Sequence, residues 1–184
     1  LLTWFFQWIF HGVTFHGQPN PAWAVNWFSA VAGAASCGVL AMLISRSGMD
    51  LLHSLKKESD VLGETTENVF CSVAGIAGGL LLAFSQGTWS QAVIAEVYTL
   101  NSFFQALVLL FFYRWMADPK QVKWLFIFAF VLGLGITNHI TLMFLGLGFA
   151  IGMAFRDIRL FRDFAITGVP ILAIVIFNRW AMGI

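Results

Sequence analysis

The chain carries very little charge. Lys and Arg number ten and Asp and Glu nine, together 10% of 184 residues, whereas apolar residues make up 59%. A soluble domain of this length has too much surface for its volume to hide so many apolar side chains. The composition therefore excludes a soluble globular domain and predicts a protein whose main partner is the lipid bilayer. A net charge of only +1 also gives no basis for binding nucleic acid.

Cysteine is almost absent as well. Cys37 lies inside an apolar run and Cys71 begins another, and neither belongs to a CxxC pair. We expect both to be small buried apolar residues and exclude a cysteine metal site. His11 and His16 do not have the i, i+4 spacing of a helical metal site, so we expect them at the membrane interface and predict no metal ligands. The sequence also contains no phosphate-binding glycine loop and no nucleophile elbow.

Long apolar runs are what the chain has in abundance. A helix that crosses a bilayer needs about 20 apolar residues, and the runs predict one all-α domain over residues 1–184, a polytopic transmembrane helical bundle of about six spans. The two runs on either side of Asn138 and His139 are short, so their complete crossing stays open. The expected spans are residues 22–45, 69–84, 93–115, 122–137, 140–155 and 164–180.

Two segments outside these spans have their own character. Residues 1–21 combine Trp and Phe clusters with a closing turn rich in Pro and Gly, which predicts a helix lying in the membrane interface. Residues 46–68 hold mixed charges and predict a water-exposed loop that is helical in part. Within the first two spans, small residues such as Gly33, Gly75 and Gly79 predict faces where neighbouring helices approach closely.

The distribution of charge predicts how the bundle lies in the membrane. When the expected spans alternate in direction, every Lys and Arg except Arg179 falls on one side, which the positive-inside rule makes cytoplasmic. Residues 46–68 then form a cytoplasmic loop, and residues 1–21 lie on the opposite, trans side. Glu96 is the one acid on the trans side, at the edge of a run otherwise free of charge, where a carboxylate is costly and usually functional.

Three stretches of the chain resemble a known family. NPAWAVNWFSAVAGAASCGVL, FSQGTWSQAVIAEVYTLNSFF and LGLGITNHITLMFL occur in this order. They resemble the multi-spanning membrane proteins related to protein O-mannosyltransferases, formerly a domain of unknown function. The resemblance implies a GT-C-like bundle, because these proteins belong to the GT-C superfamily of membrane glycosyltransferases, whose members use a polyprenyl-phosphate sugar donor on the trans side. It is strongest to bacterial members, so the bacterial inner membrane is the expected location and the endoplasmic reticulum membrane the alternative.

The resemblance implies roles for polar residues of the trans side. Glu96 is the predicted catalytic residue, which orients the acceptor hydroxyl or helps to hold a metal–phosphate group; alternatively, it is a structural acid paired with His139 or Tyr98. Asn138 and His139 are predicted to bind substrate in the same cleft, with His139 donating to the lipid phosphate, unless this histidine is a satisfied residue at a helix junction. Trp89 is predicted to stack on the sugar or lipid, with an aromatic belt residue as the alternative.

The predicted chemistry depends on sequence beyond this chain. In the family, a first span and an acidic loop with a principal catalytic carboxylate would precede Leu1. We therefore expect part of a longer glycosyltransferase acting on a protein or glycan acceptor, in which a divalent metal is a further candidate cofactor. Two other functions stay open: a structural or accessory subunit bound to other membrane subunits and, less well supported, a transporter, whose site would lie near the bilayer midplane.

Overall fold

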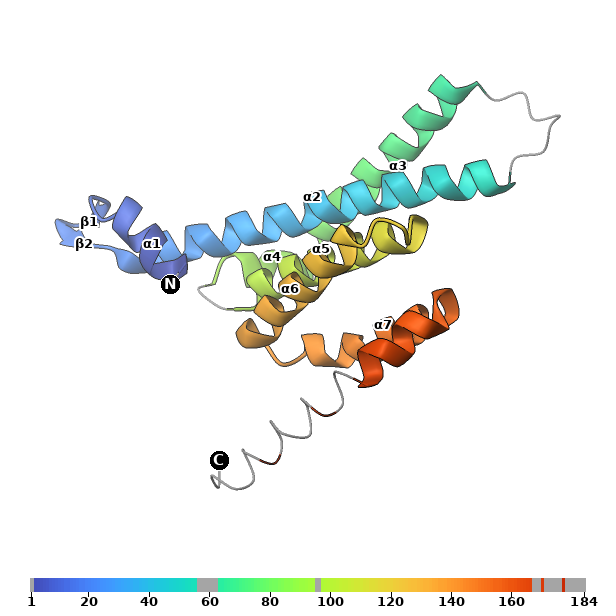
Figure 1. Cartoon of the computed structure of the whole chain (residues 1–184). Helices are drawn as coiled ribbons and strands as arrows, with labels where there is room; N and C mark the ends of the chain where they lie inside the picture. The colour runs from blue at the N-terminus through green and yellow to red at the C-terminus, as the bar shows by residue number, and fades with distance from the viewer. Residues whose placement is uncertain (1, 56–62, 95–96, 167–169, 171–176, 178–184) are drawn as a thin grey trace.

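The computed structural model describes residues 2–55, 63–94, 97–166, 170 and 177. Regular structure in these residues is helical except for one short hairpin, which confirms the predicted all-α membrane bundle (Figure 1). Among them, three helices, α2, α3 and α5, are long and apolar enough to cross a membrane. The elements are α1 (Leu2–Ile9), β1 (Thr14–Phe15), β2 (Gln18–Pro19), α2 (Pro21–Leu55), α3 (Glu64–Ala83), α4 (Gln86–Ala92), α5 (Tyr98–Ala117), α6 (Lys123–Asn138) and α7 (Leu142–Arg156).

The N-terminal segment folds back through the hairpin. Strands β1 and β2 are antiparallel, and the two residues between them, His16 and Gly17, have φ angles of 49° and 77°. A tight two-residue hairpin turn of this kind needs positive φ at both positions. The ring of Phe10 then packs against Trp23 and Trp27 of α2, with centroid distances of 5.4 and 5.7 Å. The turn is where the sequence placed it, whereas the interfacial position of this segment remains a prediction.

Helix α2 is longer than predicted. Its 35 residues extend about 50 Å at 1.5 Å per residue, whereas the hydrocarbon core of a bilayer is about 30 Å thick. Residues 46–55, expected to start a loop, continue the helix, and residues 64–68 already belong to α3. No proline interrupts this part of α2, and Gly48 lies against α3, where an added Cβ would be 3.3 Å from the Cys71 Sγ. Residues 56–62 lie outside the described residues, and the cytoplasmic position of the segment remains a prediction.

Glycines let α2 and α3 pack closely. Gly75 and Gly79 lie about one turn apart on α3, and both are buried. An added Cβ at Gly79 would lie 2.9 Å from both the Cys37 carbonyl oxygen and the Ala41 Cβ, and one at Gly75 would overlap the Ala41 carbonyl. The spacing of small residues four apart favours such contacts in membranes. The predicted close approach is therefore confirmed for this face.

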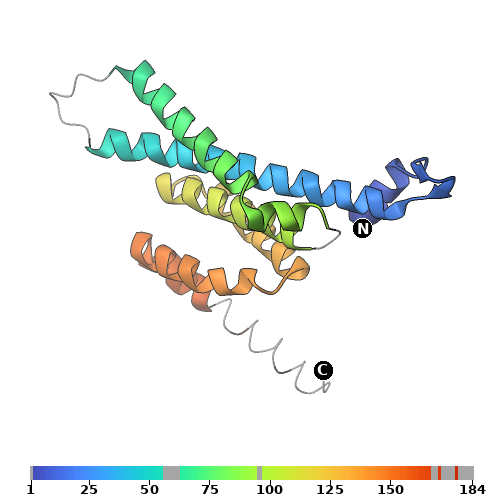
Figure 2. The same ribbon diagram turned by 180° about the vertical axis from the view of Figure 1, so that it is seen from behind.

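An aromatic core joins α5, α6 and α7. The ring centroid of Phe112 on α5 lies 5.3 Å from that of Phe128 on α6 and 4.8 Å from that of Phe149 on α7. Phe128 is only 2% exposed. Because α5 contacts α2 as well as α6 and α7, it is the central helix of the bundle (Figures 1 and 2).

The last three predicted spans are described to different extents. Helices α6 and α7 have 16 and 15 residues, about 24 and 22 Å long, and so are shorter than the hydrocarbon core. Both match the short apolar runs of the sequence. The final predicted span, residues 164–180, lies for the most part outside the described residues. The residues of this span that the structure does describe, 164–166, 170 and 177, are helical.

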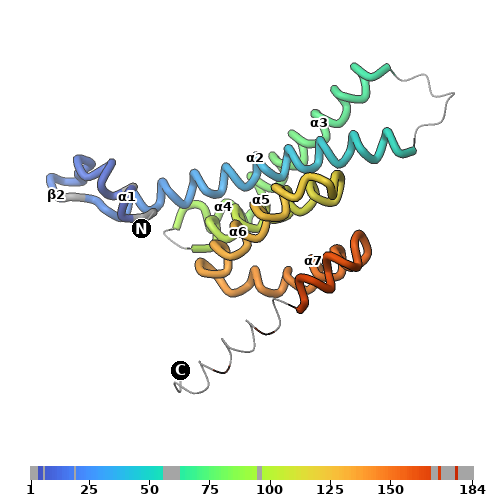
Figure 3. The backbone as a smooth tube through the Cα atoms, in the orientation of Figure 1, coloured from blue at the N-terminus to red at the C-terminus, as the bar shows by residue number. Residues whose placement is uncertain are grey.

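The bundle has two distinct ends. Figure 3 shows the C-terminal ends of α2, α5 and α7 gathered with the N-terminal ends of α3 and α6. Arg114 in the last turn of α5, Lys123 at the start of α6 and Arg156 at the end of α7 belong to this basic end. The start of α5, the end of α6 and the start of α7 form the opposite end. Which end faces the cytoplasm remains a prediction.

Candidate functional site

The start of α5 lies further along the chain than predicted. The span expected from residue 93 begins instead at Tyr98, and a short helix, α4, precedes it. Ser85 caps α4 by accepting a hydrogen bond from the Thr88 N–H at 3.3 Å. Helix α5 has Val97 at its N-cap position, and no side chain among the described residues caps it. Within these residues, the positive end of the helix dipole therefore has no side-chain acceptor.

Glu96, the predicted catalytic residue, lies outside the described residues. Its role therefore remains a prediction. The described neighbours Ile94 and Val97 are both exposed. The structure does describe the residues predicted to share the site with it, beginning with the junction between α6 and α7.

A group of polar residues, the His139 cluster, links the start of α5 to this junction. It consists of Asn101, His139 and Thr141, which are hydrogen-bonded to one another, and the adjacent Asn138. The Asn101 Nδ2 donates to the Thr141 Oγ1 at 3.1 Å, and this hydroxyl lies 2.9 Å from the His139 Nδ1. The Asn138 Nδ2 donates to the Val97 carbonyl at 3.4 Å, a long bond. Residues about 40 positions apart in the sequence are thus brought together, and Asn138 and His139 lie beside the start of α5, whereas the cleft they are predicted to share with Glu96 remains a prediction.

The cluster fixes which nitrogen of His139 carries the proton. The Thr141 backbone N–H donates to the His139 Nδ1 at 3.3 Å, so this nitrogen is an acceptor. Because Asn101 donates to the Thr141 hydroxyl, that hydroxyl is free to donate its own proton to the same Nδ1. We assign neutral His139 to the Nε2–H tautomer on this basis. Its Nε2–H makes no hydrogen bond within the part of the chain that the structure describes.

The ring of His139 is also held from one side by an aromatic neighbour. The Tyr98 ring centroid lies 5.7 Å from that of His139, with an interplanar angle of 47°. Tyr98 is 45% exposed, so it borders the imidazole without enclosing it. The imidazole is half-buried, which leaves it accessible to a ligand.

Several buried oxygens near the start of α5 have no hydrogen-bond partner among the described residues. They are the Asn101 Oδ1 and Thr99 Oγ1 on α5, the Gln91 Oε1 on α4 and the Ser29 Oγ on α2. Thr99 packs against Gly33, where an added Cβ would be 3.6 Å from the Thr99 Cγ2, and Ser29 lies one turn before Gly33 on the same face of α2. An unpaired buried polar group costs about 1–3 kcal/mol. Water or a polar ligand at this end of the bundle would remove that cost.

Trp89 is separate from the His139 cluster. Its indole is 58% exposed and stacks on Phe84, with centroids 6.1 Å apart. It also lines a cavity of about 210 Å³ between α2 and α4, whose other walls include Gly33, Ala34 and Ala92. This groove is apolar, and it suits a hydrocarbon chain better than a sugar.

Sequence reasoning missed three members of this region: Thr99, Asn101 and Thr141. Each is a small polar residue in or beside a long apolar run, and such residues in membrane helices usually find a partner. Their position was therefore a usable signal. Their hydrogen-bond partners could not be predicted from the sequence, because the Asn101–Thr141 bond joins residues 40 positions apart.

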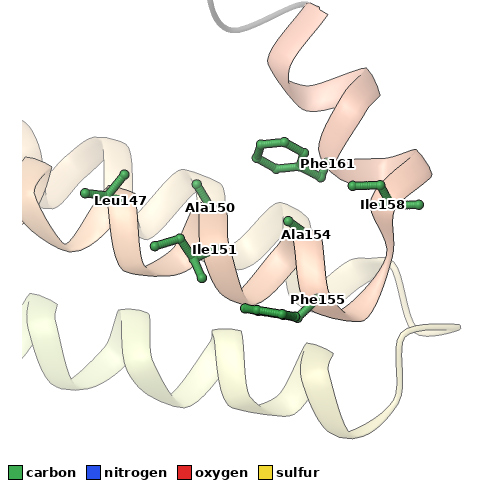
Figure 4. Close-up of a pocket in the computed structure, with 7 residues that line it drawn as sticks. All are labelled: Leu147, Ala150, Ile151, Ala154, Phe155, Ile158 and Phe161. Atoms are coloured by element: carbon green, nitrogen blue, oxygen red, sulfur yellow. The ribbon is translucent and has the colours of Figure 1, made fainter.

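The described residues contain no group of three or more His, Cys, Asp or Glu that could hold a metal ion. The His11 Nδ1–H donates to the Trp8 carbonyl at 2.8 Å, and the ring of His16 packs against Phe15. Both histidines are exposed. A further cavity of about 410 Å³ lies along α7 and the residues after it, but its lining is carbon only (Figure 4). It offers no group for transfer chemistry.

The fold and this cluster define a helical membrane protein with a polar site at one end of its bundle. The family model described as the Protein O-mannosyl-transferase TMEM260 N-terminal domain matches residues 2–161. Because the match covers most of the chain, the chain belongs to this family, as the sequence resemblance predicted. A search of the curated proteins and a search of the solved structures each gave no match.

Proposed function

We propose that this chain is part of a membrane glycosyltransferase that transfers a sugar from a polyprenyl-phosphate donor to a protein or glycan acceptor on the trans side. Membership of a family named for protein O-mannosyl transfer carries the proposal. Mannose is therefore the first sugar to test and a protein hydroxyl the first acceptor. The GT-C mechanism, the trans-side orientation and the bacterial inner membrane, with the endoplasmic reticulum as alternative, rest on the sequence resemblance.

The proposed reaction makes two demands on the protein. The bond between the anomeric carbon and the phosphate oxygen breaks, and a bond to the acceptor oxygen forms. The acceptor proton needs a base, and the polyprenyl phosphate that leaves needs stabilisation of its charge. In this proposal Glu96 orients the acceptor hydroxyl and takes its proton, and His139 donates a hydrogen bond to the leaving phosphate.

The geometry around His139 supports this second role. Its Nδ1 is occupied by Thr141, so the Nε2–H is the donor left for a ligand. The start of α5, without a side-chain cap, adds the positive end of a helix dipole next to the same residue. The unpaired oxygens of Thr99 and Asn101 would accept hydrogen bonds from sugar hydroxyls.

Two further predicted residues have supporting parts in the proposal. Asn138 is tied to the Val97 carbonyl and so holds the end of α6 against the start of α5. Trp89 borders the apolar groove between α2 and α4, which supports a contact with the polyprenyl chain more than stacking on the sugar.

A divalent metal does not fit the described residues taken alone. The His139 cluster offers one imidazole and no carboxylate, and carboxylates are the ligands that Mg²⁺ and Ca²⁺ prefer. A metal would need Glu96 and carboxylates outside this chain. We therefore assign no step of the reaction to it.

The experiment is substitution of Glu96 in the full-length protein of which this chain is a part. We expect Glu96→Gln to lower mannose transfer from a polyprenyl-phosphate mannose donor by about 10²-fold or more, the usual contribution of a general base. Membrane insertion and thermal stability should be unchanged. Glu64→Gln, at an exposed acid in the first turn of α3, is the matched control and should keep full activity. Full activity of Glu96→Gln would exclude its catalytic role.

A further inference from the structure

A polar cavity lies at the basic end of the bundle, far from the His139 cluster. Its volume is about 410 Å³, and α2, α3 and α5 each contribute to its lining. Arg46 and Asp50 come from α2, Asn68 from α3, and Tyr113 and Arg114 from α5. We call it the Arg114 pocket. Arg114 lies 16 residues after the first residue of α5, about 24 Å along the helix, so this pocket is independent of the proposed transfer site.

The pocket lies where three apolar runs end together. On α2 the predicted span stops immediately before Arg46, on α3 it begins immediately after Asn68, and on α5 it stops one residue after Arg114. A shared level at which membrane helices turn from apolar to polar is the level of the lipid head groups. The position of the pocket therefore favours a ligand that comes from the membrane surface.

The charges in the pocket favour an anion. Two arginines and one acid line the pocket, and Asp50 already accepts a hydrogen bond from the Tyr113 hydroxyl. No ion pair joins Arg46 or Arg114 to an acid within the described residues. Arg114 is instead placed by Trp124, with its guanidinium carbon 4.7 Å from the ring centroid. Guanidinium groups bind phosphate oxygens through paired N–H donors.

The surface next to the pocket is suited to acyl chains. Val69 and Phe70 follow Asn68 directly on α3 and are 57% and 69% exposed. A free phosphate ion would make no use of these side chains, whereas the hydrocarbon of a lipid would cover them. The combination of a basic cavity and an adjacent apolar helix face therefore points to a lipid as the source of the phosphate.

We propose that the Arg114 pocket binds the phosphate group of an anionic membrane lipid. Arg46 and Arg114 hold the phosphate oxygens, and Asn68 and Asp50 face the hydroxyl groups of the head group. Basic pockets between membrane helices are a recurring form of lipid recognition. The proposal does not depend on the transfer reaction, because no residue of the His139 cluster takes part.

The test measures lipid binding by the full chain. The purified protein is mixed with phosphatidylglycerol, phosphatidylcholine or inorganic phosphate, and bound lipid is counted by native mass spectrometry while the Tm is followed in parallel. We expect phosphatidylglycerol to be retained and to raise the Tm, and Arg46→Gln and Arg114→Gln each to weaken its binding by about 10-fold, the usual effect of losing one hydrogen bond between charged groups. Arg159→Gln, an exposed arginine outside the pocket, should bind as the parent does.

A variant expected to bind more tightly distinguishes a loss of lipid contacts from misfolding of the arginine variants. Asp50→Asn removes the negative charge of the one acid among the described residues that line the pocket. It keeps an oxygen that can accept from Tyr113, so this variant should bind phosphatidylglycerol more tightly. Equal binding by the parent, Asp50→Asn and the two arginine variants would overturn the proposal, as would equal retention of phosphatidylcholine. A Tm increase with inorganic phosphate that matches the increase with phosphatidylglycerol would overturn the assignment to a lipid.

Discussion

Thr141 is the residue on which the geometry of His139 depends most directly. Its hydroxyl accepts from the Asn101 Nδ2 at 3.1 Å and lies 2.9 Å from the His139 Nδ1. Thr141→Val replaces this hydroxyl by a methyl group of nearly the same size. The change therefore removes two hydrogen bonds while it leaves the packing between α5 and α7 almost unaltered.

The expected magnitudes follow from these two bonds. Hydrogen bonds between membrane helices contribute about 0.6 kcal/mol on average and up to about 1.7 kcal/mol. The Asn101 amide, whose Oδ1 is already unpaired, would lose its donor contact as well. We expect the free energy of unfolding to fall by about 1–2 kcal/mol. If His139 donates to the leaving phosphate, a similar loss of stabilisation in the transition state lowers the transfer rate by about 10-fold.

The assay measures unfolding and mannose transfer on the same preparations of the full-length protein. Thr141→Ser keeps the hydroxyl and is the matched control, so it should stay close to the parent in both measurements. A double-mutant cycle with Asn101→Leu should give a coupling free energy of about 0.6–1.7 kcal/mol between Asn101 and Thr141. A valine variant that matches the serine variant in rate and stability, with no coupling in the cycle, would refute the reasoning.

Three further predictions concern packing and the apolar groove. Gly79→Val should lower the free energy of unfolding by about 1–3 kcal/mol because the new side chain overlaps Ala41 and the Cys37 carbonyl, whereas Gly38→Val, where an added Cβ meets nothing within 4 Å, should cost far less in the same measurement. Phe128→Ala should destabilise the bundle by about 3 kcal/mol through the cavity it leaves, and Phe144→Ala, at a ring that is 81% exposed, should show little change in thermal unfolding. Trp89→Ala should raise the KM for the lipid donor more than it lowers kcat. The control Trp8→Ala, at an indole that is 62% exposed on α1, should leave both kinetic constants unchanged. Equal effects of the two substitutions would contradict a role for the groove.

The sequence predicts best where an apolar run is interrupted by polar residues. Asn138 and His139 are polar residues that interrupt a largely apolar stretch, and α6 ends at Asn138 in the structure. The small residues of α3 predict its contact with α2 because glycines let the backbones of membrane helices approach closely. In both cases the signal is local, since the residues that carry it also form the feature.

The sequence does not predict a helix boundary where the boundary does not coincide with a change in hydropathy. Apolarity marks where lipid begins, and it does not mark where a helix ends, so α2 continues past Arg46 to Leu55. The break between α4 and α5 falls at the start of the span expected from residue 93, with Val97 at the N-cap of α5, and the apolar residues on either side of Glu96 do not mark it as a helix boundary. The His139 cluster was only half predicted for another reason: Asn101 and Thr141 meet through the tertiary packing of α5 against α7, which no local pattern records.

Helix α5 connects the two polar regions, and its partner α2 holds it near both ends. Near the start of α5, Thr99 packs on Gly33 of α2, and near its end the Tyr113 hydroxyl donates to Asp50 of α2. The 20 residues of α5 extend about 30 Å, the thickness of the hydrocarbon core. Contacts at both levels oppose sliding of α5 along α2. A lipid bound in the Arg114 pocket would therefore reinforce the position of α5, and with it the distance between Asn101 and Thr141, without touching the His139 cluster.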